Sequence, residues 1–172
     1  MKLLTEIMDE EYPNQYEVSY KVRKASRAVI LNEKKQIAVL YVSRDNYHKL
    51  PGGGIEENES IFMALHREVL EEVGAIVEVK EAVGVIIEYR NYFKQLQISY
   101  CFLATLKALS SSNLTDYEKN EVFILKWMSL EEALLSVKND QPTTYMGRFI
   151  KKRDYSFLLE AKELLIQDNK NH

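Results

Sequence analysis

A glycine triplet followed directly by a helical pattern constrains the fold of this chain more than any other feature of its sequence. Residues 52–54 are all glycine and follow Pro51, which indicates a tight loop whose backbone can approach other groups closely. Beyond the loop, apolar residues recur at every fourth position: Ile61, Leu65, Val69 and Val73. This spacing predicts a helix over residues 60–73, with Asn58 as its N-cap and Gly74 as its left-handed terminator.

Acidic residues lie at unusual positions around this predicted helix. With about 100° per residue counted from Ile61, the apolar stripe covers about 0 to 120°. Glu72 then lies at about 20°, Glu68 at about 340° and Glu71 at about 280°. Two carboxylates are therefore inside or beside the stripe that should be buried. Ala64, at about 300°, leaves open space where all three carboxylates converge.

Three carboxylates this close need a compensating cation. Like charges repel and raise one another's pKa unless a cation neutralises them, and oxygen ligands supplemented by water are what Mg²⁺ or Mn²⁺ prefers. A glutamate-rich helix is ordinarily a solvated surface, but these acids occupy the wrong angles for such a surface. The sequence therefore predicts a Mg²⁺ site, with Mn²⁺ as the alternative ion, whose ligands include Glu68, Glu71 and Glu72.

The segment from Gly53 to Ala75 resembles the Nudix box, G-x5-E-x7-R-E-U-x-E-E-x-G-U, in which U is a bulky apolar residue. The matching residues are Gly53, Glu59, Arg67, Glu68, Val69, Glu71, Glu72, Gly74 and Ala75. Ala75 is smaller than the pattern requires, which concerns packing and leaves the chemistry intact. A chance match to the polar and glycine positions is expected about once in 10⁸ starting points. The chain is thus similar to the Nudix hydrolases, the MutT-type pyrophosphohydrolases, and we expect one Nudix domain over residues 1–172.

The resemblance implies a role for each residue of the box. The backbone carbonyl of Gly52 is a further metal ligand, and Gly53 and Gly54 let the backbone approach the metal and the substrate phosphates. Glu59 pairs with Arg67, which ties the loop to the helix and orients the acids for catalysis. The structural positions of the box are Gly53, Glu59 and Gly74.

The resemblance also implies a reaction. Nudix enzymes hydrolyse a nucleoside diphosphate linked to another group, by attack of water on one phosphorus of the pyrophosphate. Metal ions held by the three glutamates would polarise the phosphoryl oxygens, neutralise the leaving phosphate and lower the pKa of the attacking water. Glu68 is the first choice for the general base. In some relatives the base comes from a later loop, where Glu121 is the matching candidate and Glu118 its neighbour. The substrate implied is a small nucleotide derivative whose identity the box leaves open.

Further segments have the pattern of strands. They are residues 28–31, 36–42, 76–79, 83–87, 96–106 and 123–127. The first two are separated by a short polar turn and predict a β-hairpin. Alternate residues from Leu96 to Leu106 are apolar, which predicts an amphipathic strand with one buried face.

Two helices are expected after the last strand. Ser129 to Glu132 form a capping box that opens a helix through about Val137, and a closing helix over about residues 155–167 places its apolar residues on one face. Basic residues within 148–153 form either a local positive patch or merely exposed charge just before the closing helix. Mixed strands with one central and two late helices indicate a sheet covered on both sides. The expected fold class is α/β, and the resemblance narrows it to a Nudix-type α/β/α sandwich with a mixed, curved sheet and a loop–helix–loop catalytic motif.

Residues outside the box are candidates for contact with the substrate. Tyr92 and Arg90 lie between two predicted strands, where an aromatic ring could stack on a base and an arginine could meet phosphate. Arg44 precedes the glycine triplet and could reach phosphate, as could His48 and Lys49. Packing explains the aromatic residues equally well, and a solvated loop explains the basic ones.

Bulk properties argue against several classes of function. A net charge of -3 and a pI near 5.7 argue against binding to a nucleic-acid polymer. No apolar run is long enough to span a bilayer, and the N-terminus turns acidic at Glu6 before reaching signal-peptide length. We therefore expect no membrane association and a cytoplasmic location. Cys101 is expected as a buried packing thiol. Many Nudix relatives are homodimers, so the resemblance favours a homodimer.

Two other functions stay open at this level. The same fold can serve as a nucleotide-binding or regulatory module without catalysis, and an isomerase can use the same scaffold. The intact acids argue against the first alternative, because a binding-only site has no need for all three glutamates. The box alone does not decide against the second.

Overall fold

Three long strands form the centre of the computed structural model, in which residues 1–13, 19–110 and 123–170 are described. They are β2 (Lys21–Leu31), β6 (Ala75–Arg90) and β7 (Gln95–Leu109). Shorter strands of the described chain lie beside them in the same mixed sheet: β1 (Leu3–Ile7), β3 (Ile37–Val42), β4 (Tyr47–Lys49), β5 (Gly52–Gly54) and β8 (Phe123–Met128). The β-branched and aromatic residues that fill the long strands favour this extended conformation.

The order of the strands explains how distant segments meet. The sheet runs β1-β6-β7-β2-β3-β4, with β5 paired to β2 and β8 paired to β3. β1 is parallel to β6 and β2 is parallel to β7, whereas the remaining pairs are antiparallel. The predicted hairpin is present, because β2 and β3 pair at Leu31 and Ile37. Beyond that pair β3 pairs with β4 and β8, while the middle of β2 pairs with β5.

β6 is a single strand, so the prediction of two strands at 76–79 and 83–87 is wrong. Its pairing with β7 shifts in register between residues 76 and 77, between 79 and 81, and between 82 and 84. Each shift is a bulge-like irregularity that disturbs the alternation of side chains between the two faces. The interruption in the sequence pattern therefore marks changes of register inside one continuous strand.

β7 confirms the predicted strand at 96–106, but both of its faces are buried near the middle. The face expected to be polar and exposed carries Gln97, Ser99 and Cys101, each 0% exposed. Cys101 belongs to the same core cluster as Phe157 of α4 (Tyr145–Lys170), and burial raises the pKa of its thiol. A polar strand face can be buried when a neighbouring element supplies polar partners. The prediction of one exposed face is therefore wrong, whereas the buried Cys101 was predicted correctly.

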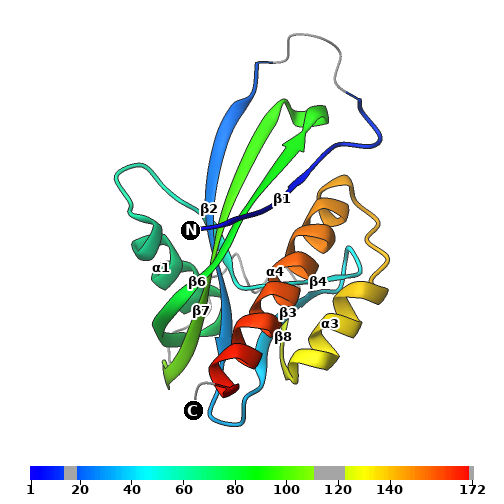
Figure 1. The fold of residues 1–172 in the computed structure, drawn as a ribbon. Helices are drawn as coiled ribbons and strands as arrows, with labels where there is room; N and C mark the ends of the chain where they lie inside the picture. The colour runs from blue at the N-terminus through cyan, green and yellow to red at the C-terminus, as the bar shows by residue number, and fades with distance from the viewer. Residues whose placement is uncertain (14–18, 111–122, 171–172) are drawn as a thin grey trace.

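Helices cover both faces of the sheet. Figure 1 shows α1 (Ile61–Val73) on one side of the long strands and α3 (Leu130–Asn139) with α4 on the other. Under α1, Leu65 belongs to one core cluster with Phe102. Under α4, Phe157 belongs to a second cluster with Ile86. Full burial of each such side chain contributes roughly 1.5 to 3 kcal/mol. The predicted α/β/α sandwich with a mixed sheet is confirmed.

The N-cap of α1 is Ser60, and the prediction of Asn58 is wrong. Ser60 Oγ accepts a hydrogen bond from the Met63 amide at 3.1 Å. Asn58 instead has a φ of 65°, which places it in a left-handed turn of the preceding loop. Gly74 ends the helix as predicted, with a φ of 65° and its amide bonded to the Leu70 carbonyl.

α4 begins ten residues before the predicted start at 155. Thr144 Oγ1 accepts a hydrogen bond from the Gly147 amide at 3.1 Å, which starts the first turn. The basic residues at 148–153 are therefore part of the helix and do not precede it. The capping box of α3 at Ser129 is confirmed. No helix in the described ranges is long and apolar enough to cross a membrane.

Ser60→Ala is expected to lower the free energy of unfolding by about 1 kcal/mol, because the Met63 amide loses its side-chain acceptor. Ser60→Asp is the matched control, since its carboxylate restores an acceptor at the same place. Urea denaturation followed by circular dichroism measures both variants. A loss in Ser60→Ala that Ser60→Asp does not recover would show that the cap is not what stabilises this end of α1.

Candidate active site

The glycine triplet forms β5, which pairs antiparallel with β2. Gly52 lies opposite Arg27, and Gly54 lies opposite Ala25. Gly52 has a φ of 131°, which residues with a side chain rarely adopt, and a Cβ there would lie 2.1 Å from the carbonyl oxygen of Ser26. Glycine is therefore required at position 52 for the loop backbone to lie against β2.

Gly53 leaves the space in which the carboxylate of Glu68 lies. A Cβ on Gly53 would be 2.2 Å from Glu68 Oε1, so any side chain at this position would displace the carboxylate. Leu65 and Val69 are fully buried under α1, which fixes the rotation of the helix and turns Glu68 toward the loop. The loop backbone and this carboxylate therefore meet directly.

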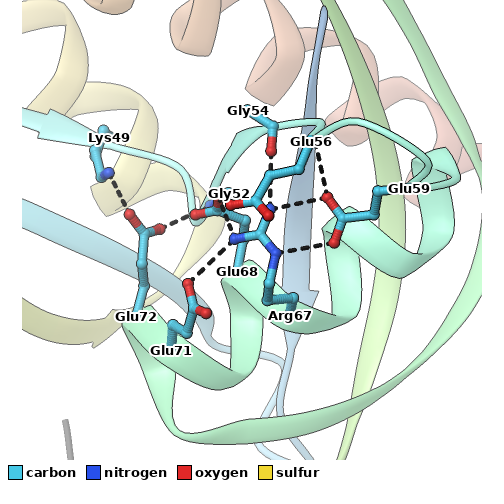
Figure 2. A network of polar contacts seen from close by, with 9 residues as sticks. All are labelled: Lys49, Gly52, Gly54, Glu56, Glu59, Arg67, Glu68, Glu71 and Glu72. Carbon is cyan, nitrogen blue, oxygen red and sulfur yellow. Dashed lines mark hydrogen bonds and ion pairs between the residues drawn. The ribbon is translucent and has the colours of Figure 1, made fainter. Parts of the chain in front are cut away.

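Arg67 binds the loop to the helix through its whole guanidinium group (Figure 2). Its Nε and Nη2 donate to the two carboxylate oxygens of Glu59 at 2.9 and 3.0 Å, and Nη2 also donates to the Gly54 carbonyl at 2.9 Å. Its Nη1 donates to Glu68 at 2.9 Å and to Glu71 at 3.2 Å. The hydrogen bonds between Arg67 and Glu59 raise the pKa of the arginine and lower the pKa of the glutamate. Arg67 is thus the centre of the polar network.

Burial changes the acidity of Glu68. Desolvation is the largest influence and raises the pKa of Glu68, and the nearby charge of Glu72 adds to the increase, while Arg67 opposes it. A carboxylate with a raised pKa binds a proton more strongly. Glu68 is therefore a stronger base than an ordinary exposed glutamate.

Glu72 is held by a lysine that the sequence suggested only as a phosphate contact. Lys49 Nζ lies 2.5 Å from Glu72 Oε1, and the Gly52 amide donates to Glu72 Oε2 at 2.8 Å (Figure 2). Both charged side chains are mostly buried, and the Lys49 ammonium also lies 4.5 Å from the centre of the Phe123 ring. Lys49 therefore holds Glu72 against the glycine loop.

The three carboxylates lie along one edge of α1, and each contacts a cationic side chain. Arg67 contacts the first two and Lys49 contacts the third. In the described ranges, no three acidic, histidine or cysteine side chains are grouped closely enough to hold an ion in this arrangement. The described residues leave no open space beside Ala64, contrary to expectation, because Ala64 is fully buried. Opposite charges nearby stabilise the ionised carboxylates, and here the protein itself supplies those cations.

Two carboxylates, one at the C-cap of α3 and one within α4, fix the chain just before the glycines. Asp140 Oδ2 accepts a hydrogen bond from the His48 amide at 2.6 Å, and Asp140 Oδ1 lies 2.8 Å from His48 Nδ1. Asp154 Oδ2 accepts from the Leu50 amide at 2.9 Å. Asp154 is fully buried and also pairs with Arg153 at 2.7 Å. The loop is thus held from α3 and α4 as well as from α1.

Comparison with known proteins identifies the family. The family model described as the NUDIX domain matches residues 21–162, which is most of the chain. The chain belongs to the Nudix family. This confirms the resemblance drawn from residues 53–75, which are the Nudix box of this protein.

Two curated relatives and one solved structure illustrate the similarity to other Nudix proteins. Nudix hydrolase 7 of Arabidopsis thaliana is 30% identical over 123 residues, which covers 69% of this chain and 41% of the relative. Nudix hydrolase 8 of the same plant is 29% identical over 135 residues, which covers 76% of this chain and 36% of the relative. The chain therefore spans less than half the length of these relatives. An ADP-ribose pyrophosphatase from Streptococcus suis is 21% identical, with a TM-score of 0.54 over 81% of this chain and 91% of its own, and shares the fold.

The candidate substrate residues outside the Nudix box lie in different surroundings. Arg44 is in the turn between β3 and β4, and its Nε lies 3.3 Å from a carboxylate oxygen of its neighbour. Tyr92 belongs to a 3-10 turn, η1 (Asn91–Phe93), between β6 and β7, and is 58% exposed. Arg90 is 1% exposed and pairs with Glu88 at 2.9 Å. Phosphate contact by Arg90 therefore stays a prediction, for a side chain that is buried in this arrangement.

Two arginines of β2 interact electrostatically with acids of the Nudix box, and sequence reasoning missed both. Arg23 is half-buried, and Arg27 is 6% exposed. Burial lowers the pKa of both arginines, to about 10 for Arg27, while Glu68 opposes the shift at Arg23 and Glu72 opposes it at Arg27. Their spacing of four residues in a strand places them on one face, which is the signal that could have found them.

Arg67→Lys is expected to speed hydrogen exchange of the amides at 55–59 roughly tenfold or more, because one ammonium group cannot replace the fork of a guanidinium. Exchange followed by mass spectrometry measures the change. His66→Gln is the control, since His66 is the exposed neighbour on the same helix. Equal exchange in Arg67→Lys and the parent protein would contradict the central role of Arg67.

Proposed function

We propose that this Nudix protein hydrolyses a phosphoanhydride bond in a nucleoside diphosphate linked to another group, using a divalent metal ion. The observation that carries the proposal is the meeting of the Glu68 carboxylate with the glycine loop at Gly53. This contact brings the carboxylate against the loop backbone at an edge of α1 that bears two further carboxylates. The names of the two curated relatives, both Nudix hydrolases, support the same class of activity.

The donor set suits a hard divalent cation. On binding, Glu68, Glu71 and Glu72 would converge on the ion together with the carbonyl of Gly52, because Mg²⁺ and Mn²⁺ prefer such oxygen ligands. The bound ion would supply polarisation of the phosphoryl oxygens and a water of lowered pKa. Gly53 supports this assignment, since the missing Cβ is what leaves room for the first carboxylate.

The residues of the box have separate tasks in this mechanism. Glu68 accepts the proton of the attacking water, which fits the pKa raised by its burial. Arg67 does not touch the reacting atoms and orients Glu68 and Glu71. Lys49 keeps Glu72 beside the loop, so the ligands stay close to the position of the phosphates.

The loop that precedes β8 offers a second candidate for the base. Glu121 and its neighbour Glu118 lie outside the described residues, so their support comes from the sequence and the family resemblance alone. β8 pairs with β3 along its whole length, beginning with Phe123 opposite Val42. Phe123, the first residue of β8, therefore belongs to the same sheet as the glycine loop.

The substrate is proposed only as a class. A panel of nucleoside triphosphates, ADP-ribose, nucleotide sugars and dinucleoside polyphosphates, assayed with Mg²⁺ and again with a chelator, should show metal-dependent hydrolysis of at least one compound. Mn²⁺ added in place of Mg²⁺ tests the alternative ion. Binding without turnover across the whole panel would favour a regulatory module and contradict the hydrolase proposal.

Glu72→Gln is expected to lower kcat by about a hundredfold or more, because the amide is a poor ligand for a divalent ion. Thermal denaturation should show that the fold is kept. Glu57→Gln is the matched control, since Glu57 is exposed in the neighbouring loop and is not one of the matching positions of the box. Normal turnover in Glu72→Gln would place the metal site elsewhere.

Glu121→Gln decides between the two candidate bases. A loss of kcat with unchanged Mn²⁺ affinity, measured by calorimetry, is the result expected if the loop supplies the base. Retained kcat in Glu121→Gln leaves Glu68 as the base. The pH profile of the variant gives an independent readout, because removal of the base removes the acidic limb of the profile.

A further inference from the structure

A cluster of buried charges lies on the face of the sheet that α4 covers. We define the arginine cluster as Arg23, Arg27, Arg90 and Arg153 with Glu88 and Asp154. Strand pairing aligns Arg23 of β2 and Glu88 of β6 with the same residue of β7, Gln97. Arg23 donates to Gln97 Oε1 at 2.8 Å, and Arg90 donates to the same oxygen at 3.4 Å. Arg153 joins from α4, with its Nη1 at 3.7 Å from Glu88 Oε2.

Positive charge exceeds negative charge in the arginine cluster. Its guanidinium groups outnumber its carboxylates by two, and Arg27, Arg90 and Arg153 are 6%, 1% and 1% exposed. Among the described residues, Arg27 Nε, Arg90 Nε and Arg153 Nη1 have no hydrogen-bond partner. The same holds for Glu88 Oε2. Because buried charge without compensation is costly, negative charge is expected close to the cluster.

The Nudix box supplies part of this negative charge. Glu68 interacts electrostatically with Arg23, and Glu72 interacts with Arg27. Arg23 lies next to the glycine loop, since a Cβ on Gly54 would be 2.9 Å from Arg23 Nη2. Arg23 is half-buried whereas the other three arginines are buried, so its guanidinium is the part of the cluster within reach of a ligand.

A metal ion bound to the acids of the box would neutralise their negative charge. The arginine cluster would then lose part of its compensating charge, and an anion bound beside it would restore that charge. We propose that Arg23 binds a phosphate oxygen of the substrate's diphosphate group, and that the buried arginines behind it supply the positive field that makes this position an anion site. The fork of a guanidinium suits bidentate contact with phosphate. The inference rests on the proposed function for the nature of the ligand, and it assigns substrate binding to residues outside the Nudix box.

The test measures binding without turnover. Methylenebisphosphonate, whose P–C–P bridge resists hydrolysis, is titrated into the full chain by calorimetry in the presence of Mg²⁺. Arg23→Gln is expected to weaken binding roughly tenfold to a hundredfold, because charge-assisted hydrogen bonds are lost. Lys34→Gln removes the same charge from an exposed residue of the turn between β2 and β3, beyond the end of β2 that is far from Arg23, and should change binding by less than about twofold. Equal affinity in Arg23→Gln and the parent protein would overturn the proposal.

Metal binding separates a lost contact from a damaged site. Removing a positive charge beside Glu68 should tighten Mn²⁺ binding about twofold to fivefold. Arg23→Lys keeps the charge but loses the fork, so it should show intermediate bisphosphonate affinity with unchanged Mn²⁺ affinity. Weaker binding of both ligands in both variants would assign Arg23 to the architecture of the site and overturn the proposal.

The outcome is independent of whether a hydrolysed substrate is found. Bisphosphonate binding that depends on Arg23, together with no turnover in the compound panel, would support the anion site and remove the hydrolase proposal. Turnover in the panel, together with equal bisphosphonate affinity in Arg23→Gln and Lys34→Gln, would keep the hydrolase proposal and overturn the anion site.

Discussion

One buried carboxylate, Asp154, connects the C-terminal helix with the loop on which the site is built. It accepts hydrogen bonds from the Leu50 amide and from the Arg153 guanidinium. Because Asp154 is fully buried, its charge requires these partners. Loss of Arg153 would leave the buried carboxylate without its adjacent counter-charge. The interaction spans 104 positions of the sequence, so the geometry of the glycine loop depends on a helix formed near the end of the chain.

The acids of the Nudix box lie between two sets of cations. Arg67 and Lys49 contact them directly, and Arg23 and Arg27 act on them from β2. This arrangement lets a short helix edge concentrate negative charge without the repulsion that the bare carboxylates would suffer. It also explains how one small site could bind a cation and an anion side by side. A bound cation would neutralise the carboxylates as the protein's cations do here, and a bound anion would neutralise the arginines as the carboxylates do here.

Local features were predictable from the sequence, and contacts between distant segments were not. The helix at 61–73, its terminator Gly74 and the capping box at Ser129 depend on residues a few positions apart, which is the range over which sequence patterns act. The contact of Lys49 with the box, the burial of Arg90 and the early start of α4 depend on partners from other elements. In β6 the changes of register disturbed the alternation itself, so no pattern of period two could reveal one strand.

Parallel pairing of β2 with β7 couples the site to the order in which the chain folds. Lys21 pairs with Gln95 and Leu31 with Thr105, so the strand that supports the glycine loop gains its long partner only after β6 and β7 exist. Contacts between distant segments form slowly because a long loop must close first. During synthesis the Nudix box therefore leaves the ribosome well before the strand that completes its support.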